Sequence, residues 1–281
     1  MSRQTHIAYE EGEHSLCHSD IQWPRKVDVL GVEISATTYE EATEVIIEAA
    51  QQRSGGAVTC HPVHGLMEAK RDPELARHLS EFNMITPDGQ PVRWAMNLLH
   101  DTQLRERVYG PELMIRLCRE AALKGISVYL YGSTPKVIGR LTDVLRGRFP
   151  SMHIVGVESP PFRELTAQED AAMVDRINSS GAGLCFIGLG SPKQDRFAVA
   201  HMNRISAVQV CVGAAFDFHA GTLRMAPRWM QRNGLEWLFR LGFEPRRLWK
   251  RYLVSNSTFA AELMLHYLRN EVTRRLKPSQ L

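Results

Sequence analysis

The stretch ITPDGQP, residues 85–91, decides how the middle of this chain folds. Residues 82–85 are typical of the end of a buried strand, and Pro87 and Gly89 prevent that strand from continuing. Pro91 suits the first turn of a helix, where a missing backbone N–H costs little. We therefore expect Asp88 at the carboxyl end of a strand, beside a helix N-terminus, where ligands bind in open α/β sheets. The alternative is that Asp88 only caps the helix, because Pro-Asp-Gly is also an ordinary turn sequence.

A rhythm of strands and helices extends outward from this stretch. Strands are expected at residues 27–34, 57–60, 82–85, 127–131, 153–157, 184–187 and 208–212, and helices at 37–51, 63–80, 92–99, from 111 onward, 135–148, 166–180 and 192–203. Mostly apolar strands that alternate with helices predict a parallel sheet covered on both faces. The predicted fold class is α/β, a Rossmann-like parallel sheet flanked by helices.

The two ends of the chain differ from this middle part. Residues 1–26 are polar and without periodicity, and we expect them to be poorly ordered. Residues 27–215 are expected to form the α/β catalytic domain, and residues 216–281, which lack clear strands, a helical C-terminal appendage. The appendage is basic: residues 240–277 hold nine Lys or Arg and three Asp or Glu, whereas the rest of the chain holds 25 and 28. This asymmetry predicts an anionic partner near the C-terminus.

Composition indicates a globular protein of the cytosol. The 281 residues, 44% of them hydrophobic, suffice for one large core with an appendage. The five cysteines form no C-x-x-C pair, and four of them lie in apolar surroundings, which favours reduced thiols. No apolar run reaches transmembrane length, and residues 1–26 lack the apolar centre of a signal peptide. We expect a protein that does not span the membrane.

Two strand ends share a glycine-rich design. Gly-Ser-Thr-Pro at residues 132–135 and Gly-Leu-Gly-Ser-Pro-Lys-Gln at 188–194 both place glycines at a strand end and proline just inside a helix. Glycine lets backbone N–H groups approach a ligand, and a helix N-terminus favours phosphate, so the two turns could cradle a nucleotide diphosphate. The alternative is that they only turn the chain. Neither matches G-x-G-x-x-G or the Walker pattern.

A metal site is not expected. His61 and His64 are separated by Pro62, which prevents the helical i, i+4 pair of zinc enzymes, and these histidines are expected to line a polar cleft or cap a helix. The chain also has no D-x-D triplet, the usual means of holding a divalent ion against a nucleotide-sugar diphosphate. If the donor is a nucleotide sugar, protein groups must stabilise the leaving phosphate.

The most specific motifs come late in the chain. They are GAAFDFHAG at residues 213–221, RMAPRW at 224–229, GLEWLFRL at 234–241 and EPRRLWKRY at 244–252. Together with Thr59, the TPDG turn at 86–89, RVYGP at 107–111 and GLGSPKQ at 188–194, they occur in a fixed order. Over about residues 27–255 the sequence resembles the WecG/TagA/CpsF family of bacterial glycosyltransferases, although members often carry Asn where this chain has His61.

The resemblance implies a reaction. It is an inverting, metal-independent transfer of an N-acetylmannosamine-type or glucose-type sugar from a UDP donor to a polyprenyl-diphosphate-linked sugar, in cell-surface polysaccharide biosynthesis. It implies no cofactor and a peripheral enzyme on the cytoplasmic, inner face of the plasma membrane, and it leaves a homo-oligomer open.

The resemblance also implies roles for residues. Asp88 corresponds to the proposed general base, and Thr59 and Arg107 to other residues of the catalytic pocket. The expected donor-binding residues are His61, Gly132, Gly188, Gly190 and Gln194. The residues expected to contact the acceptor or an anionic membrane are Arg240, Arg246, Arg247, Arg251, Trp237 and Trp249.

Other functions stay open on the sequence alone. Basic and aromatic residues interleave in the appendage, as an interfacial membrane helix requires, although a charge run is often only a solvated face. The same tail could bind nucleic acid, a partner that the favoured interpretation does not include. A nucleotide-dependent oxidoreductase and a UDP-sugar-binding protein without catalysis are further alternatives.

Overall fold

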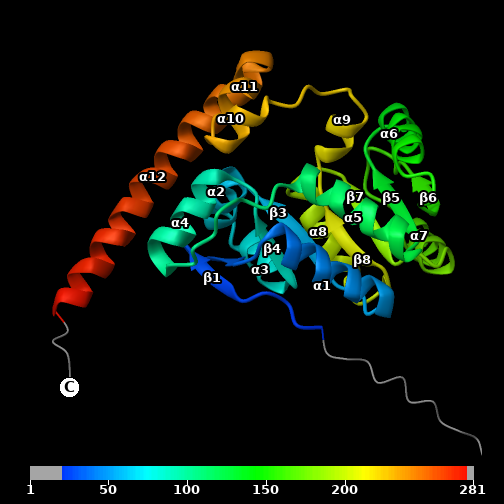
Figure 1. Cartoon of the computed structure of the whole chain (residues 1–281), viewed down its shortest axis with the longest axis horizontal. Helices are drawn as coiled ribbons and strands as arrows, with labels where there is room; N and C mark the ends of the chain where they lie inside the picture. The colour runs from blue at the N-terminus through cyan, green and yellow to red at the C-terminus, as the bar shows by residue number, and fades with distance from the viewer. Residues whose placement is uncertain (1–20, 277–281) are drawn as a thin grey trace, which may run out of the picture.

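The computed structural model describes residues 21–276, except for the side chains of residues 247, 250, 251 and 270–276 (Figure 1). Residues 1–20, which belong to the segment expected to be poorly ordered, and residues 277–281 lie outside the described part.

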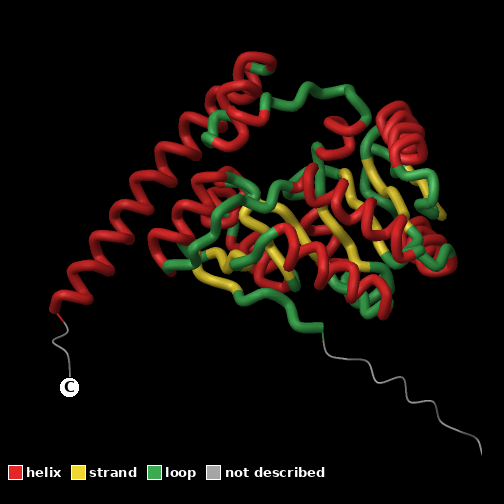
Figure 2. Tube along the Cα trace, in the orientation of Figure 1, coloured by secondary structure: helices red, strands yellow, loops and turns green. Residues whose placement is uncertain are grey.

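A six-stranded sheet forms the centre of the molecule, and the tube in Figure 2 shows its strands between layers of helices. Its strands are β3 (Ala57–His61), β4 (Met84–Pro87), β5 (Val128–Gly132), β6 (Ile154–Glu158), β7 (Leu184–Gly188) and β8 (Val208–Cys211). Their order is β4-β3-β8-β7-β5-β6, and every neighbouring pair is parallel. The predicted parallel α/β fold is confirmed.

Helices bury both faces of this sheet. One core cluster lies under α1 (Tyr39–Gln52), α5 (Gly110–Lys124), α6 (Pro135–Arg148) and α9 (Ala215–His219). The other lies under α2 (Val63–Arg71), α3 (Pro73–Glu81), α4 (Gln90–His100), α7 (Ala167–Ser179) and α8 (Lys193–His201). Since both faces are covered, the strands can be apolar throughout, as β5 and β7 are.

Polar caps begin several helices where the sequence predicts them. Thr38 and Thr134 accept backbone N–H bonds at the starts of α1 and α6, and Thr166 forms a full capping box with Glu169 on α7. The expected helical region 63–80 is divided in two, because Asp72 caps a new helix that Pro73 begins.

The prediction of one strand at residues 27–34 is wrong. The segment is an antiparallel hairpin of β1 (Lys26–Val29) and β2 (Val32–Ser35). Leu30 and Gly31 take φ values of 58° and 94°, which turn the chain back on itself. The hairpin lies beside the sheet, where the Ser35 hydroxyl accepts a hydrogen bond from the Ile85 backbone N–H.

The C-terminal part is helical, as expected. Helices α10 (Arg228–Arg232) and α11 (Glu236–Phe243) lead into the long α12 (Pro245–Leu276). Figure 1 shows α12 running past α2 and α4, and its side chains Leu248 and Phe259 are buried. None of the described helices combines the length and apolar composition needed to cross a bilayer.

Candidate active site

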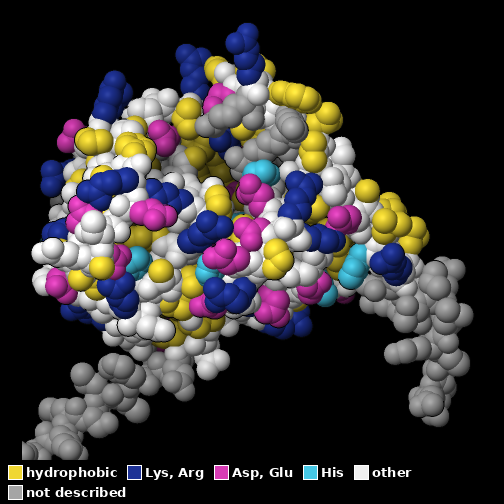
Figure 3. All heavy atoms as spheres, turned by 180° about the vertical axis from the view of Figure 1, so that it is seen from behind, with side chains coloured by type: hydrophobic (Ala, Val, Ile, Leu, Met, Phe, Trp, Pro, Cys, Tyr) yellow, Lys and Arg dark blue, Asp and Glu magenta, His cyan; other side chains and the backbone are white. Residues whose placement is uncertain are grey.

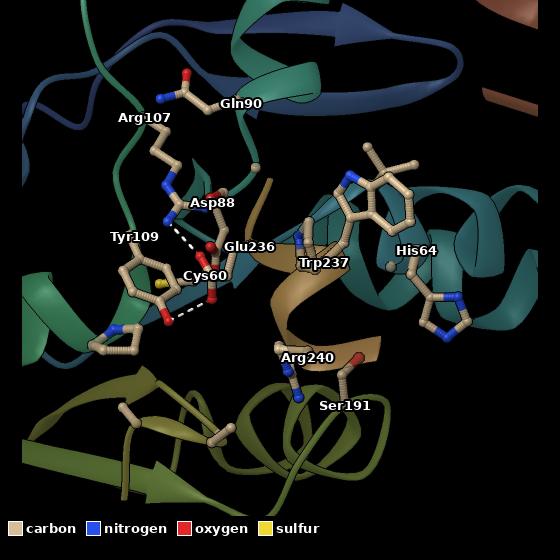
Figure 4. A pocket seen from close by; sticks show the side chains of 18 of the residues that line it. Cys60, His64, Asp88, Gln90, Arg107, Tyr109, Ser191, Glu236, Trp237 and Arg240 are labelled. Carbon is tan, nitrogen blue, oxygen red and sulfur yellow. Dashed lines mark hydrogen bonds and ion pairs between the residues drawn. The ribbon is translucent and has the colours of Figure 1, made fainter. Parts of the chain in front are cut away.

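A cleft of about 360 Å³ opens at the carboxyl ends of β3, β4, β7 and β8, within the range of small-molecule sites. The strand ends and the helix starts that follow them form its floor, and α11 and α12 form the opposite wall (Figure 4). The polar or charged side chains that line it include Asp88, Gln90, Arg107, Tyr109, Gln194, Glu236 and Arg240.

Asp88 lies directly after β4, at the point where the sequence predicts it. Its backbone N–H donates to the carbonyl oxygen of His61 at 3.3 Å, which ties its turn to β3. Burial raises the pKa of the Asp88 carboxyl to about 7, although Arg107 and a hydrogen bond from the Gly110 N–H favour the charged form. Gly89, rather than Asp88, occupies the cap position of α4, so the carboxylate is not the cap of that helix.

Arg107 is held by neighbours on two elements. Its Nη1 donates to the backbone oxygen of Asp88 at 3.1 Å, and its Nη2 to Oε2 of Glu236 at 2.6 Å. The guanidinium carbon lies 4.2 Å from the centre of the Tyr109 ring, whose hydroxyl donates to Oε1 of Glu236 at 2.7 Å. The dashed lines in Figure 4 mark the two bonds to Glu236. The first residue of α11 is thereby bound to the sheet domain beside Asp88.

The loop after β7 forms another part of the lining. Gly190 takes a φ of 78°, and its N–H donates to Oε1 of Gln194 at 3.2 Å. Gln194 is buried and lies against Gly213, the residue that follows β8 by two positions. Ser191 of this loop and Arg240 of α11, both labelled in Figure 4, line the cleft together, so the loop and the appendage share it.

Gly132 and Gly188 lie at neighbouring strand ends but, among the described residues, are not part of this lining. A Cβ on Gly132 would lie 2.6 Å from the carbonyl carbon of Gly188, and a Cβ on Gly188 would lie 2.6 Å from the Phe216 ring. Close packing of β5, β7 and α9 therefore requires glycine at both positions.

Thr59 and His61 lie beneath the floor of the cleft. Thr59 is fully buried and donates to Oδ1 of Asp195 at 2.8 Å, and His61 Nε2 lies 3.4 Å from the same oxygen. His61 lowers the pKa of the Asp195 carboxyl, which burial opposes. A Cβ on Gly65 would meet the His61 ring at 2.1 Å, so glycine at that position makes room for the imidazole. Thr59 and His61 therefore support the floor of the cleft from beneath and do not line it.

The predicted appendage residues are divided between the cleft and the outer surface. Arg240 lines the cleft, with its guanidinium 5.9 Å from the Phe218 ring, and Trp237 lines it beside Tyr252. Arg246 and Trp249 are exposed on α12. The side chains of Arg247 and Arg251 lie outside the described residues.

Several residues of the site were not predicted as such, among them Tyr109, Asp195 and Glu236. Glu236 offered a signal, because it is a carboxylate inside a strongly basic segment. Asp195 follows Gln194 in the glycine-rich motif and offered a weaker signal of the same kind. Among the side chains that the structure describes, no three or more His, Cys, Asp or Glu form a group suited to a metal ion.

Most of the chain matches known proteins. The model of the glycosyl transferase WecG/TagA/CpsF family matches residues 27–273. A relative from Bacillus spizizenii strain W23 is 30% identical over 204 residues, covering 72% of this chain and 76% of the relative. One from Bacillus subtilis strain 168 is 29% identical over 203 residues, covering 72% and 77%. Both carry the name N-acetylglucosaminyldiphosphoundecaprenol N-acetyl-beta-D-mannosaminyltransferase.

Proposed function

Because the chain belongs to the glycosyl transferase WecG/TagA/CpsF family and is a glycosyltransferase, we propose that it moves an N-acetylmannosamine-type or glucose-type sugar from a UDP donor to a polyprenyl-diphosphate-linked sugar. The product would enter a bacterial cell-surface polysaccharide. The names of the two Bacillus relatives support an N-acetylmannosamine donor and an acceptor of N-acetylglucosaminyl-diphosphoundecaprenol.

The observation that carries this proposal is Asp88 in the cleft, with its pKa raised to about 7 by burial. Direct displacement at the anomeric carbon needs one base to take the proton from the acceptor hydroxyl. A base whose pKa lies close to the working pH is ionised in part of the molecules and still holds a proton well. Inversion needs no enzyme nucleophile, so a single carboxylate in this role is sufficient.

The donor site is proposed at the loop after β7. Gly190 and Gln194 would contact the UDP diphosphate, since they line the cleft across from Arg240. Gly132 and Gly188 would shape this site by letting the strand ends approach each other. Thr59 and His61 would act from beneath the floor through Asp195.

Guanidinium groups are proposed to stabilise the leaving diphosphate without a metal ion. Arg240 is the stronger candidate, because among the described residues it has no carboxylate partner, whereas Arg107 is paired with Glu236. Guanidinium binds phosphate oxygens bidentately. Transfer in EDTA should equal transfer in Mg²⁺, and loss in EDTA that Mg²⁺ or Mn²⁺ restores would refute this part.

Acceptor binding is proposed to occur at a membrane surface, on the cytoplasmic face. Exposed apolar side chains follow α10 to α12: Trp229, Leu238, Phe243, Trp249, Leu253, Met264, Leu265 and Leu268. Figure 3 shows hydrophobic side chains along this edge, with Lys and Arg beside them at the tip. An apolar edge with basic neighbours is suited to an anionic bilayer, from which the lipid-linked acceptor need not be extracted.

The experiment is a transfer assay with a panel of UDP-sugars and N-acetylglucosaminyl-diphosphoundecaprenol. The proposal expects a lipid product one sugar longer with one donor of the panel. Donor binding without transfer would support the non-catalytic alternative, and neither binding nor transfer with any UDP-sugar would overturn the proposal.

A further inference from the structure

A glutamate of the appendage lies inside the cleft, and both of its carboxylate oxygens are bound. Glu236 Oε2 accepts from Arg107 at 2.6 Å, and Oε1 accepts from the Tyr109 hydroxyl at 2.7 Å. The Arg107 and Glu236 side chains are only 10% and 12% exposed. A short, charge-assisted pair with so little exposure is stronger than a surface ion pair. It joins two segments that are 129 residues apart in the sequence.

The same guanidinium also holds the turn that carries Asp88. Nη1 of Arg107 donates to the Asp88 backbone oxygen, and the next residue, Val108, donates its N–H to the Pro87 oxygen at 3.1 Å. Fixing Arg107 through Glu236 therefore fixes the backbone on which the proposed base is mounted.

A second contact ties the appendage to that turn from the other side. The Gln90 amide donates to the backbone oxygen of Arg232 at 3.1 Å. Gly234 packs on Gln90 and Trp94 so closely that a Cβ there would lie 3.2–3.3 Å from both side chains. Residues 232–236 of the appendage thus hold the Asp88 turn at two points.

Charge around Asp88 is unevenly balanced, because two carboxylates, those of Asp88 and Glu236, share the one guanidinium of Arg107. Besides Glu236, the titratable or charged groups that face Asp88 or share its cleft are Tyr39, Cys60, His61, His64, Arg107, Tyr109, Arg240 and Tyr252. Burial is the main cause of the raised pKa of Asp88, Arg107 lowers that pKa, and Glu236 raises it. Glu236 therefore acts on Asp88 by position and by charge.

We propose that Glu236 is a positioning residue: its carboxylate holds Arg107 and Tyr109, and through Arg107 it fixes the turn that carries Asp88. The inference rests on the proposed role of Asp88 as the base.

Glu236→Gln is the direct test, because it removes the charge and keeps the shape. Glu262→Gln is the matched control: it also breaks an ion pair between the appendage and the sheet domain, with Lys70, but on the surface and outside the cleft. Surface pairs contribute little, so the control should behave as the wild type does.

Two readouts separate positioning from a merely structural role. Hydrogen exchange of the Asp88, Arg93 and Val108 amides, all hydrogen-bonded around the turn, should be faster in Glu236→Gln and unchanged in Glu262→Gln. Turnover should fall by up to about a hundredfold, with UDP affinity unchanged. The acid limb of the pH–rate profile should move to lower pH, because a negative charge beside Asp88 is lost.

The proposal is overturned if exchange around the turn is the same in Glu236→Gln as in the wild type, or if the acid limb does not move. If Glu236→Gln does not fold, Tyr109→Phe, which removes one bond to Glu236 and no charge, should still speed exchange at these amides, and unchanged exchange would overturn the proposal. If the wild type transfers no sugar, the proposed function is wrong, and hydrogen exchange still decides whether Glu236 positions the turn.

Discussion

Asp88 combines three properties at the scale of one residue. It follows a buried strand, it lines the cleft, and its pKa is raised to about 7 by burial. A carboxyl in water has a pKa near 4 and is a weaker base toward a sugar hydroxyl than one with a raised pKa. The surroundings of Asp88, rather than its chemical type alone, make it suited to proton abstraction.

The pH dependence of transfer follows from that pKa. The ionised carboxylate is the active form, so kcat/KM should be highest above pH 7 and fall as the pH drops through about 7. Well below that value, each pH unit should reduce the rate about tenfold, because the ionised fraction falls by that factor. Initial rates across this range measure the effect. A rate that stays constant down to about pH 5 would show that no group with this pKa is required.

Residue types and strand ends were enough to predict Asp88 and the glycine-rich turn at residues 188–194 at one edge of the sheet, because the carboxyl ends of parallel strands meet there. They were not enough to separate lining residues from supporting ones. Thr59 and His61 lie on β3, whose end reaches the cleft, yet both side chains are buried against Asp195 and do not line the cleft. For Thr59, the distinction depends on its hydrogen bond to Asp195, which lies 136 residues later in the sequence. No local sequence pattern contains such a contact.

At the scale of elements, the close approach of β5 and β7 depends on Gly132. Its φ is 126°, and a Cβ would lie 2.6 Å from the Gly188 carbonyl carbon. We expect Gly132→Ala to lower the free energy of unfolding by about 2–4 kcal/mol, from backbone strain and overlap together. Denaturant unfolding monitored by circular dichroism measures this change.

Gly139→Ala is the control for that experiment. Gly139 lies in α6, is exposed, and has no atom within 4 Å of the position that a Cβ would take. Alanine there should raise stability by about 0.5–1 kcal/mol, since glycine is unfavourable inside a helix. Equal effects of the two substitutions would contradict the role assigned to the strand-end glycines.

Elements with strong periodicity were predicted from the sequence. The wrong prediction of one strand at residues 27–34 has a local cause. The segment 27–34 is mostly apolar, as a strand would be, but Leu30 and Gly31 take left-handed conformations and make it a hairpin. Glycine made the turn possible, whereas a positive φ at Leu30 is unusual and could not be expected from its type. The Glu236–Arg107 pair between α11 and the sheet domain was equally out of reach, because it depends on tertiary folding.

At the scale of the whole molecule, the appendage has two apolar faces. Leu248 and Phe259 pack inward, whereas Trp249 and Leu253 are exposed and, four residues apart, share another face of α12. We expect Trp249→Ser combined with Leu253→Ser to weaken binding to anionic phospholipid vesicles at least about tenfold, since each buried side chain contributes about 1.5–3 kcal/mol. Vesicle co-sedimentation measures the loss.

Leu123→Ser is the matched control, because Leu123 is also strongly exposed but lies on α5. It should leave vesicle binding unchanged. If the α12 double variant binds vesicles as tightly as the control does, the outer face of α12 does not contact the bilayer, and the proposed docking surface is wrong.

The account as a whole depends on Asp88 acting as base in a transfer that uses a UDP-sugar. The most direct measurement compares wild-type protein with Asp88→Asn, using transfer to N-acetylglucosaminyl-diphosphoundecaprenol and UDP binding by calorimetry. The account predicts that UDP affinity is nearly unchanged, while turnover falls at least about a hundredfold, as expected for the loss of a general base. Near-normal turnover in Asp88→Asn, with UDP affinity intact, would contradict it.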